Sequence, residues 1–264
     1  MAGTDIGWLG LAASLVLVAA AVVVSRTQRL RLEREIVVAC GRGVAQLAVV
    51  GWGLAIVLSD TTPLIWAWTW SGVIVVLASR TVHRRAPQLP GILQASLVGN
   101  GGCLVVSFLV AFGLGIFPVE ARVIVPVTGM IVGNAMKTVV VVSKRLEEEV
   151  ADRRLELEAR LALGWSGMDA IRPAVRAGLR LGLLPTIENV RGLGLIFLPG
   201  AMTGLILAGV DPQHAVLVQL ALMFLILGAA ALAATTVALI TARRLFTADL
   251  RPVPILRLAT DEGR

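Results

Sequence analysis

The sequence predicts an all-α, polytopic integral membrane protein with seven transmembrane helices. Hydrophobic residues make up 57% of the 264-residue chain and charged residues only 16%, whereas a soluble domain carries about 25% charged residues. The mean hydropathy is +0.85. The apolar residues form continuous runs of about the 20 residues that a helix needs to cross a bilayer. This pattern excludes a soluble enzyme, and the lack of strict alternation favours helices over a membrane barrel.

Seven apolar runs are long enough to be read as membrane spans. They leave only short connections on one side of the membrane and longer, more polar ones on the other. In chain order they are Ile6–Val24, Ile36–Leu58, Pro63–Ser79, Gly91–Phe117, Val123–Val142, Ile187–Gly209 and Ala215–Ala242.

The first run resembles a signal peptide in one respect, because Ala19-Ala20-Ala21 is similar to a cleavage site. A signal peptide, however, carries its positive charge before the apolar region. Here Asp5 precedes the run and Arg26 and Arg29 follow it. We therefore expect an uncleaved first helix with its N-terminus outside.

The distribution of lysine and arginine predicts the orientation. Segments 25–35, 80–90, 143–186 and 243–264 carry four, three, eight and five of these residues, and seven spans place all four segments on one side. Basic loops stay in the cytoplasm. The expected topology is therefore N-terminus out and C-terminus in, within the plasma membrane of a bacterium. The net charge of +7 is explained by these loops, so no nucleic-acid partner is predicted.

Residues 143–186 form the one long hydrophilic stretch, and we expect them to be a cytoplasmic helical loop within a single membrane domain that covers 1–264. The first half, Lys144–Leu163, favours a solvated helix with favourable i,i+4 pairs at Glu149/Arg153 and Glu156/Arg160. Gly164-Trp165-Ser166-Gly167 then breaks the helix.

A short amphipathic helix is predicted over Met168–Leu181, ended by Pro185. One face is basic, with Arg172, Arg176 and Arg180, and the other is apolar. Such a helix lies on anionic lipid or docks in the groove of a partner protein. The residues themselves leave both alternatives open.

Polar residues within the spans mark a candidate translocation path, because buried polar groups in a bilayer face a cavity or a neighbouring helix. Arg42 and Gln46 share one helical face. Asn134 follows a Gly129-x-x-x-Gly133 motif that permits close helix approach. Glu188 and Arg191 stand at the start of the sixth run, as an intrahelical pair or as a gate at the cytoplasmic mouth.

Pro199 is predicted to kink the sixth span near its centre, freeing the carbonyl of Leu195. Broken helices at that depth line binding sites in transporters, so Met202 and Thr203 are candidate lining residues, and packing is the alternative. Met136 and the other methionines offer soft ligands or simple apolar filling. Two cysteines and two scattered histidines do not make a zinc site, so the metal ligands stay unknown.

Two further motifs carry a resemblance to a known family. Ala162-Leu163-Gly164 followed by Ile171-Arg172-Pro173-Ala174-Val175-Arg176 resembles the cytoplasmic coupling segment of ABC-transporter permeases. The run from Gly194 to Gly204, with Pro199-Gly200-Ala201-Met202-Thr203, is similar to the iron-export permease family, which includes plant aluminium-tolerance permeases. Gly133-Asn134-Ala135-Met136 and the Arg42/Gln46 pair match that family too.

The resemblance implies a permease subunit that exports iron or another metal ion as a homodimer, with two copies of an ABC ATPase. Leu163, Gly164, Trp165, Ser166, Arg172 and Arg176 would then contact the ATPase. The chain has no G-x-x-x-x-G-K-[ST] motif, so we expect no cofactor on this chain and ATP-Mg in the partner subunit. The alternatives are an ATP-independent carrier or channel, and an ABC permease for a nucleotide sugar.

Overall fold

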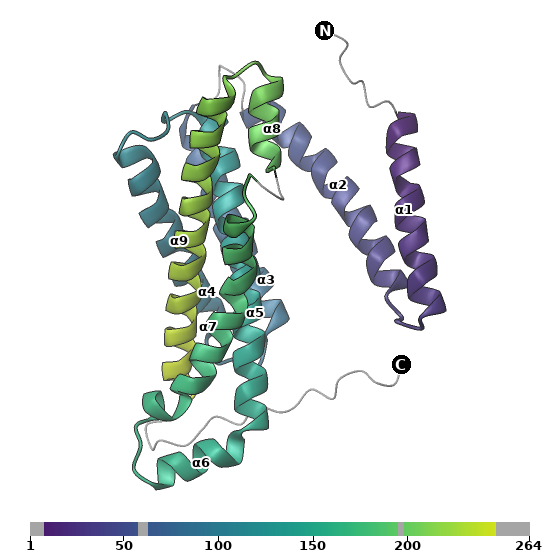
Figure 1. Cartoon of the computed structure of the whole chain (residues 1–264). Helices are drawn as coiled ribbons and strands as arrows, with labels where there is room; N and C mark the ends of the chain where they lie inside the picture. The colour runs from purple at the N-terminus through teal and green to yellow at the C-terminus, as the bar shows by residue number, and fades with distance from the viewer. Residues whose placement is uncertain (1–7, 58–62, 195–197, 247–264) are drawn as a thin grey trace. The chain divides into compact units, whose positions relative to one another are not determined.

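The computed structural model describes residues 8–57, 63–194 and 198–246, and every regular element within these ranges is a helix (Figure 1). The chain divides into two compact units, Met1–Thr62 and Pro63–Arg264. Each unit is described by itself.

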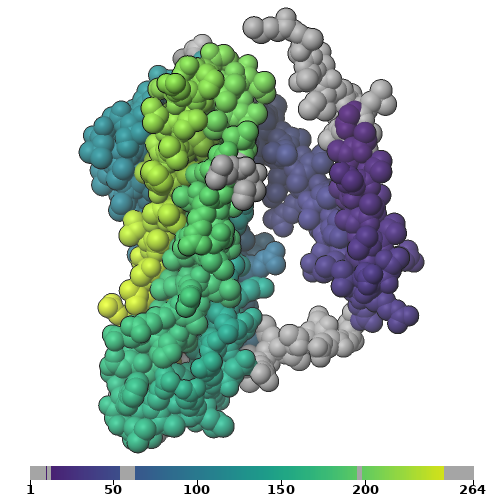
Figure 2. All heavy atoms as spheres, viewed as in Figure 1, coloured from purple at the N-terminus to yellow at the C-terminus, as the bar shows by residue number. Residues whose placement is uncertain are grey.

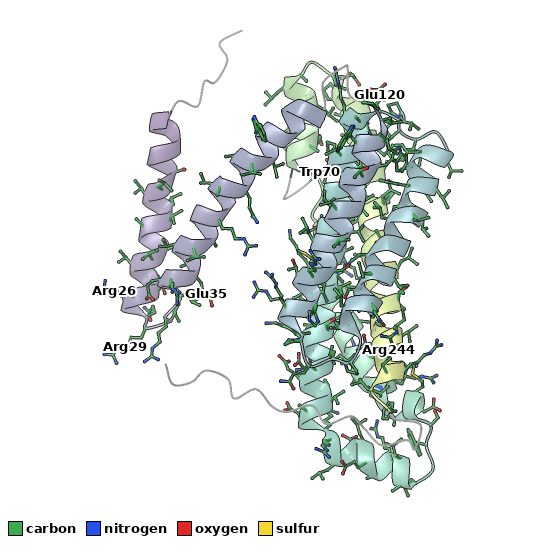
Figure 3. The ribbon with its side chains drawn as sticks, turned by 180° about the vertical axis from the view of Figure 1, so that it is seen from behind. Arg26, Arg29, Glu35, Trp70, Glu120 and Arg244 are labelled. Carbon is green, nitrogen blue, oxygen red and sulfur yellow. The ribbon has the colours of Figure 1, made fainter. Side chains whose placement is uncertain are left out.

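The first unit is a pair of contacting helices, α1 (Trp8–Thr27) and α2 (Glu33–Val57). Ser25 organises the turn between them, because its Oγ donates to Glu33 Oε1 at 3.1 Å and accepts from the Leu32 amide at 3.0 Å. Arg29 has a positive φ of 54°, a conformation that non-glycine residues seldom adopt. Figure 3 shows that Arg26, Arg29 and Glu35 gather at this turn.

The second unit is built around α5 (Ala121–Asp152), which packs against four other long helices. These are α3 (Ile65–Arg85), α4 (Ile92–Phe108), α7 (Gly167–Arg191) and α9 (Pro212–Arg244). A π-helical turn, η1 (Leu109–Gly113), extends α4. Two shorter helices, α6 (Arg154–Ala162) and α8 (Gly200–Leu207), complete the unit.

Small side chains let α4 and α9 approach closely. A Cβ atom on Gly99 would lie 2.5 Å from Val237 Cγ2 and 3.0 Å from the Ala233 carbonyl oxygen. The same part of α9 carries four buried alanines, Ala229, Ala230, Ala233 and Ala234. Membrane helices associate through such small residues because lipid supplies no hydrophobic driving force between them.

The two ends of the second unit differ in composition. One end, here called the tryptophan end, carries Trp66, Trp68 and Trp70 at the start of α3. The other, the basic end, carries Arg84 and Arg85 at the end of α3 together with Arg243 and Arg244 of α9. Figure 3 shows Trp70 and Glu120 toward one end and Arg244 toward the other. This separation is typical of a helix bundle that crosses a bilayer.

Five helices within the described residues are long and apolar enough to cross a membrane: Glu33–Gly53, Ile65–Arg85, Ile92–Gly113, Ala121–Asp152 and Pro212–Arg244. Residues 13–27, in the described part of the first predicted span, form a shorter apolar helix. The fold class is therefore all-α and multi-pass, as predicted.

The sixth predicted span, Ile187–Gly209, is not one helix. It contains the last turn of α7, a break after Arg191, and the eight residues of α8. The prediction that Pro185 ends a short amphipathic helix is also wrong, because α7 runs through Pro173 and Pro185 as a single helix of 25 residues. Both prolines are tolerated because neighbouring helices hold α7 along its length.

Candidate translocation path and coupling surface

The turn between α6 and α7 has a defined geometry. Gly164 has φ +85°, the left-handed conformation that lets the chain reverse at the end of α6. Ser166 caps α7, since its Oγ accepts from the Asp169 amide at 3.1 Å and donates to Asp169 Oδ2 at 2.6 Å. The Gly164–Gly167 helix break predicted from the sequence is confirmed.

Arg160 connects α6 to this turn and to α7. It pairs with Glu156 one helical turn earlier, and its Nη1 donates to the Ala170 carbonyl at 3.0 Å. Its guanidinium lies 5.5 Å from the ring centre of Trp165, within the range of a cation–π interaction. The turn is thus held by side-chain contacts from one residue.

The residues of the predicted coupling segment meet at one open groove. Its volume is about 450 Å³, and it is lined by Gly164, Trp165, Ser166, Asp169, Arg172, Pro173 and Arg176. Leu163 lies at the preceding position with 78% of its surface exposed, and Trp165 is 48% exposed. Figure 2 shows the atoms of α6 and the start of α7 together at one end of this unit. A large exposed leucine and tryptophan beside a basic groove are features of a protein–protein contact surface.

Two arginines of α7 differ from the other arginines of this region, because the structure gives them no ion pair with a described carboxylate. The arginines of α6 and the end of α5 all pair with glutamates: Arg145–Glu148, Arg153–Glu149 at 2.8 Å, Arg154–Glu158 at 2.8 Å and Arg160–Glu156. Arg172 pairs with Asp169 at 3.5 Å. Among the described residues, no carboxylate lies within ion-pair distance of Arg176 or Arg180, and both are exposed.

The apolar stripe of α7 is buried within the chain at Ile171 and Val175, and Met168 and Leu179 are half-buried. Ile171 and Val175 are 0% and 6% exposed, and α7 packs on α5 and α9. A Cβ on Gly167 would lie 2.8 Å from the Phe246 ring. The apolar face of α7 therefore packs inside this chain, and the choice between lipid and a partner protein stays open for its basic face. The basic face of α7 is the part that stays accessible.

The packing of α7 on α5 fixes the depth of the polar residues in both helices. The Oγ1 atoms of Thr138 and Thr186 are 3.5 Å apart, and a Cβ on Gly182 would lie 3.1 Å from the Thr138 carbonyl. The helices run antiparallel. At 1.5 Å per residue, Glu188 lies roughly level with Asn134 to Met136, and Arg191 roughly level with Gly133.

The predicted place of Glu188 and Arg191 at the cytoplasmic mouth stays a prediction, because only the predicted spans define the membrane boundary. Their level falls within the central part of the predicted span Val123–Val142. The hydroxyl groups of Ser71 and Thr128 are hydrogen-bonded at 2.8 Å. This contact aligns α3 with α5, so that levels along α7 can also be compared with levels along α3. By this comparison Arg191 lies roughly 6 Å deeper than Arg80, the first arginine of α3. The predicted pair itself is confirmed, with Arg191 Nη1 and Glu188 Oε1 2.7 Å apart.

Asn134 and Met136 are half-buried on α5. Asn134 Nδ2 donates to the Met130 carbonyl at 2.7 Å, so its amide is satisfied within its own helix rather than across helices. Four of the predicted path residues, Asn134, Met136, Glu188 and Arg191, thus share one depth. Among the described residues, the one ion pair between members of this set joins Glu188 and Arg191.

Pro199 does not kink a continuous span. It is buried and precedes α8 as the N-cap residue, with φ −64° and ψ 143°. The Pro199 carbonyl accepts from the Thr203 amide at 3.1 Å and from Thr203 Oγ1 at 3.3 Å. Met202 is half-buried on the same helix. Leu195, whose carbonyl was predicted to be freed, lies outside the described residues.

Arg42 and Gln46 lie on α2 in the first unit, one helical turn apart and both exposed within that unit. They therefore share a helical face, as predicted.

No group of three or more His, Cys, Asp or Glu side chains within the described ranges is arranged to hold a metal ion. Asp211 caps α9, because its Oδ2 accepts from the amides of Gln213 and His214 at 3.0 and 3.2 Å.

Sequence reasoning missed a set of buried polar residues inside the bundle. Asn100 of α4 is fully buried and donates to Ser79 Oγ of α3 at 3.3 Å. Gln219 of α9 is 4% exposed, and its Oε1 has no partner among the described residues. The available signal was a carboxamide side chain within each of these two apolar runs.

Comparison with known proteins identifies relatives across most of the chain. The family model described as "Uncharacterised protein family (UPF0014)" matches residues 8–246. The UPF0014 membrane protein STAR2 of Oryza sativa subsp. japonica is 38% identical over 85% of this chain and 78% of its own length. Protein ALUMINUM SENSITIVE 3 of Arabidopsis thaliana is 34% identical over 85% of this chain and 82% of its own.

A third relative, named probable iron export permease protein FetB, comes from Escherichia coli strain K12. It is 28% identical over 89% of this chain and 91% of its own length. No solved structure matches the chain. The matched range includes the α6–α7 turn and the α7–α8 break as well as the long apolar helices. This chain is a multi-pass integral membrane protein of the UPF0014 family.

Proposed function

We propose that the chain is the membrane-spanning subunit of an ABC transporter that exports iron or another metal ion, with energy from a separate ATPase subunit. The observation that carries the proposal is the open groove at the α6–α7 turn, where five of the predicted coupling residues come together. The name of the Escherichia coli relative supports metal export. The basic end of the second unit is then cytoplasmic, and two copies of the chain form the conduit.

In this proposal the ATPase binds the exposed Leu163 and Trp165 side chains and presents carboxylates to Arg176. When the bound ATPase surface moves, the α6–α7 turn moves with it. Because α7 is one continuous helix, the movement reaches the level of Glu188 and Arg191 without an intervening hinge other than the two prolines. The break between α7 and α8 is where the path opens and closes.

The test is retention of an ATP-binding subunit by the tagged chain. Membranes of cells that produce the protein are solubilised, the chain is purified, and bound proteins are labelled with a photoreactive ATP analogue. The wild-type chain is expected to retain a labelled protein, and Leu163→Asp and Arg176→Glu are expected to lose it.

The matched control is Leu155→Asp. Leu155 on α6 is 81% exposed, like Leu163 at 78%, but it does not line the groove. Retention of the labelled protein by both groove variants would show that the ATPase does not bind at the groove. Its loss with Leu155→Asp alone would place the ATPase on α6 outside the groove.

A further inference from the structure

Three buried side chains in the half of the second unit next to its basic end have polar atoms without a partner. Ser96 and Asn100 of α4 and Thr241 of α9 are each 0% exposed. Ser96 Oγ, Asn100 Oδ1 and Thr241 Oγ1 make no hydrogen bond to any described residue. Buried polar groups in proteins are almost always hydrogen-bonded, because an unpaired one destabilises the fold. These three atoms therefore need a partner that the described side chains do not supply.

The packing of α4 on α9 brings Ser96 and Thr241 to one level. A Cβ on Gly99 would lie 2.5 Å from Val237 Cγ2, and the end of α9 contacts the start of α4, so the two helices run antiparallel. Ser96 lies three residues from Gly99, and Thr241 lies four residues from Val237, both toward the basic end. At 1.5 Å per residue these steps are roughly 4.5 and 6 Å. The two hydroxyl groups thus lie within one helical turn of each other.

Both residues also lie on the same side of that contact. With about 100° of rotation per residue, Ser96 lies roughly 60° around α4 from the contact, and Thr241 roughly 40° around α9 in the same rotational sense. Because the helices are antiparallel, equal senses of rotation on the two facing surfaces lead to the same side. Asn100 lies farther round in that direction, and its Nδ2 donates to Ser79 Oγ of α3 at 3.3 Å. The three unpaired atoms therefore converge between α3, α4 and α9.

The chemistry of this position fits a small neutral molecule. The buried residues Ala234 and Ala238 lie on the same side of α9 as Thr241, so no bulky side chain of that helix competes for the position. None of the three unpaired groups is charged, so they would not balance a cation. Asn100 Oδ1 only accepts hydrogen bonds, whereas a hydroxyl group both donates and accepts. A partner that donates and accepts at once satisfies all three groups.

We propose that a bound water molecule occupies this position and bridges the three helices. The water donates to Asn100 Oδ1 and exchanges hydrogen bonds with Ser96 Oγ and Thr241 Oγ1. Buried waters typically make about three such bonds to groups that are otherwise unsatisfied. Because Asn100 also bonds Ser79, one water molecule links α3, α4 and α9 into a single block. This water site does not depend on the proposed function.

The direct test is an experimental density map of the full-length chain at a resolution that shows ordered water. A peak is expected within hydrogen-bonding distance of Ser96 Oγ, Asn100 Oδ1 and Thr241 Oγ1. A map that shows other buried waters but no peak here would overturn the proposal. A direct bond between the two hydroxyl groups, with no peak, would overturn it as well.

The sign of a stability change gives a second test. Thr241→Val removes one hydroxyl group and keeps the shape of the side chain. With a bound water, the variant loses a bond and leaves the water under-satisfied, so the unfolding temperature in detergent should fall by roughly 2–4 °C. A hydroxyl group without any partner predicts the opposite, because its removal abolishes a desolvation cost. A rise in the unfolding temperature would therefore contradict the water site.

The matched control is Thr69→Val on α3. The Oγ1 atom of Thr69 is exposed and donates to the Ile65 carbonyl of its own helix at 2.9 Å, so its loss should change the unfolding temperature little. Coupling completes the test. If Ser96 and Thr241 share one water, the double variant S96A/T241V should lose less stability than the two single variants added together. Additive losses would show that the two hydroxyl groups do not share a partner.

Discussion

Thr138 of α5 and Thr186 of α7 face each other with their Oγ1 atoms 3.5 Å apart. This contact, together with the approach of Gly182 to Val142, sets the register between the two helices. The register places Glu188 and Arg191 roughly level with residues 133–136 of α5. It is the structural basis for every statement about depth along the candidate path.

The register is directly testable by disulfide formation. In a chain with Cys40 and Cys103 replaced by serine, Thr138→Cys with Thr186→Cys should form a disulfide on mild oxidation, because the two side chains already touch. The measurement is a mobility shift after proteolysis between the two positions. Thr138→Cys with Val190→Cys, one turn away, is the control. More efficient cross-linking of the control pair would place α7 in another register.

A methyl group at Gly99 should destabilise the bundle. It would overlap Val237 and the Ala233 carbonyl, so α4 and α9 must separate, at a cost of about 1–3 kcal/mol for overpacking. The free energy of unfolding in detergent should fall for Gly99→Ala and stay nearly unchanged for Gly102→Ala, where a Cβ meets nothing within 4 Å. Equal effects of the two substitutions would contradict the close approach.

Removal of the Arg160 side chain should loosen the α6–α7 turn. Arg160→Met loses the bond to Ala170 and the contact with Trp165, together about 2–4 kcal/mol for one charge-assisted hydrogen bond and one cation–π contact. Fluorotryptophan NMR, with the signal assigned by Trp165→Phe, should show a shifted and narrower Trp165 resonance. Arg154→Met is the control, since its pair with Glu158 is exposed and worth little. An unchanged Trp165 signal in Arg160→Met would refute the contact.

Glu147 predicts a pH dependence of stability. Burial raises the pKa of its carboxyl group, which Lys144 partly opposes and Glu148 reinforces. The folded chain therefore binds this proton more tightly than the unfolded chain, so stability falls as pH rises from the ordinary glutamate pKa to the raised value. Glu147→Gln should be more stable than the wild type above that window, and the gain should vanish at lower pH. A gain that grows toward low pH would reverse the sign and contradict the assignment.

The sequence was sufficient to predict the apolar helices because each depends on a local property. Span length is set by bilayer thickness, so α3 and α9 were found within a few residues. The same holds for the turn at Gly164, where one glycine and one capping serine determine the local geometry. The i,i+4 pairs Glu149–Arg153 and Glu156–Arg160 were also predictable, because helical spacing alone brings those side chains together.

The course of α7 and α8 could not be read from the sequence, because it depends on packing between helices. Pro185 ends a helix in isolation, but contacts with α5 and α9 hold α7 intact beyond it. Conversely, the apolar run after Ile187 looked continuous, although Gly192, Gly194 and Pro199 interrupt it. Gly194 has φ +81°, which a helix does not permit. Hydropathy averages over such breaks, and the level of Glu188 relative to α5 follows only from the register of Thr186 with Thr138.

Transport into inside-out vesicles tests the central claim most directly. Vesicles that contain the chain with its ATP-binding subunit are supplied with radioactive ferrous iron, and uptake is measured with and without ATP. We expect uptake that requires ATP, that Arg176→Glu removes, and that Leu155→Asp leaves intact. The same rate of iron movement in liposomes that contain the purified chain alone, without ATP or any second protein, would contradict the account.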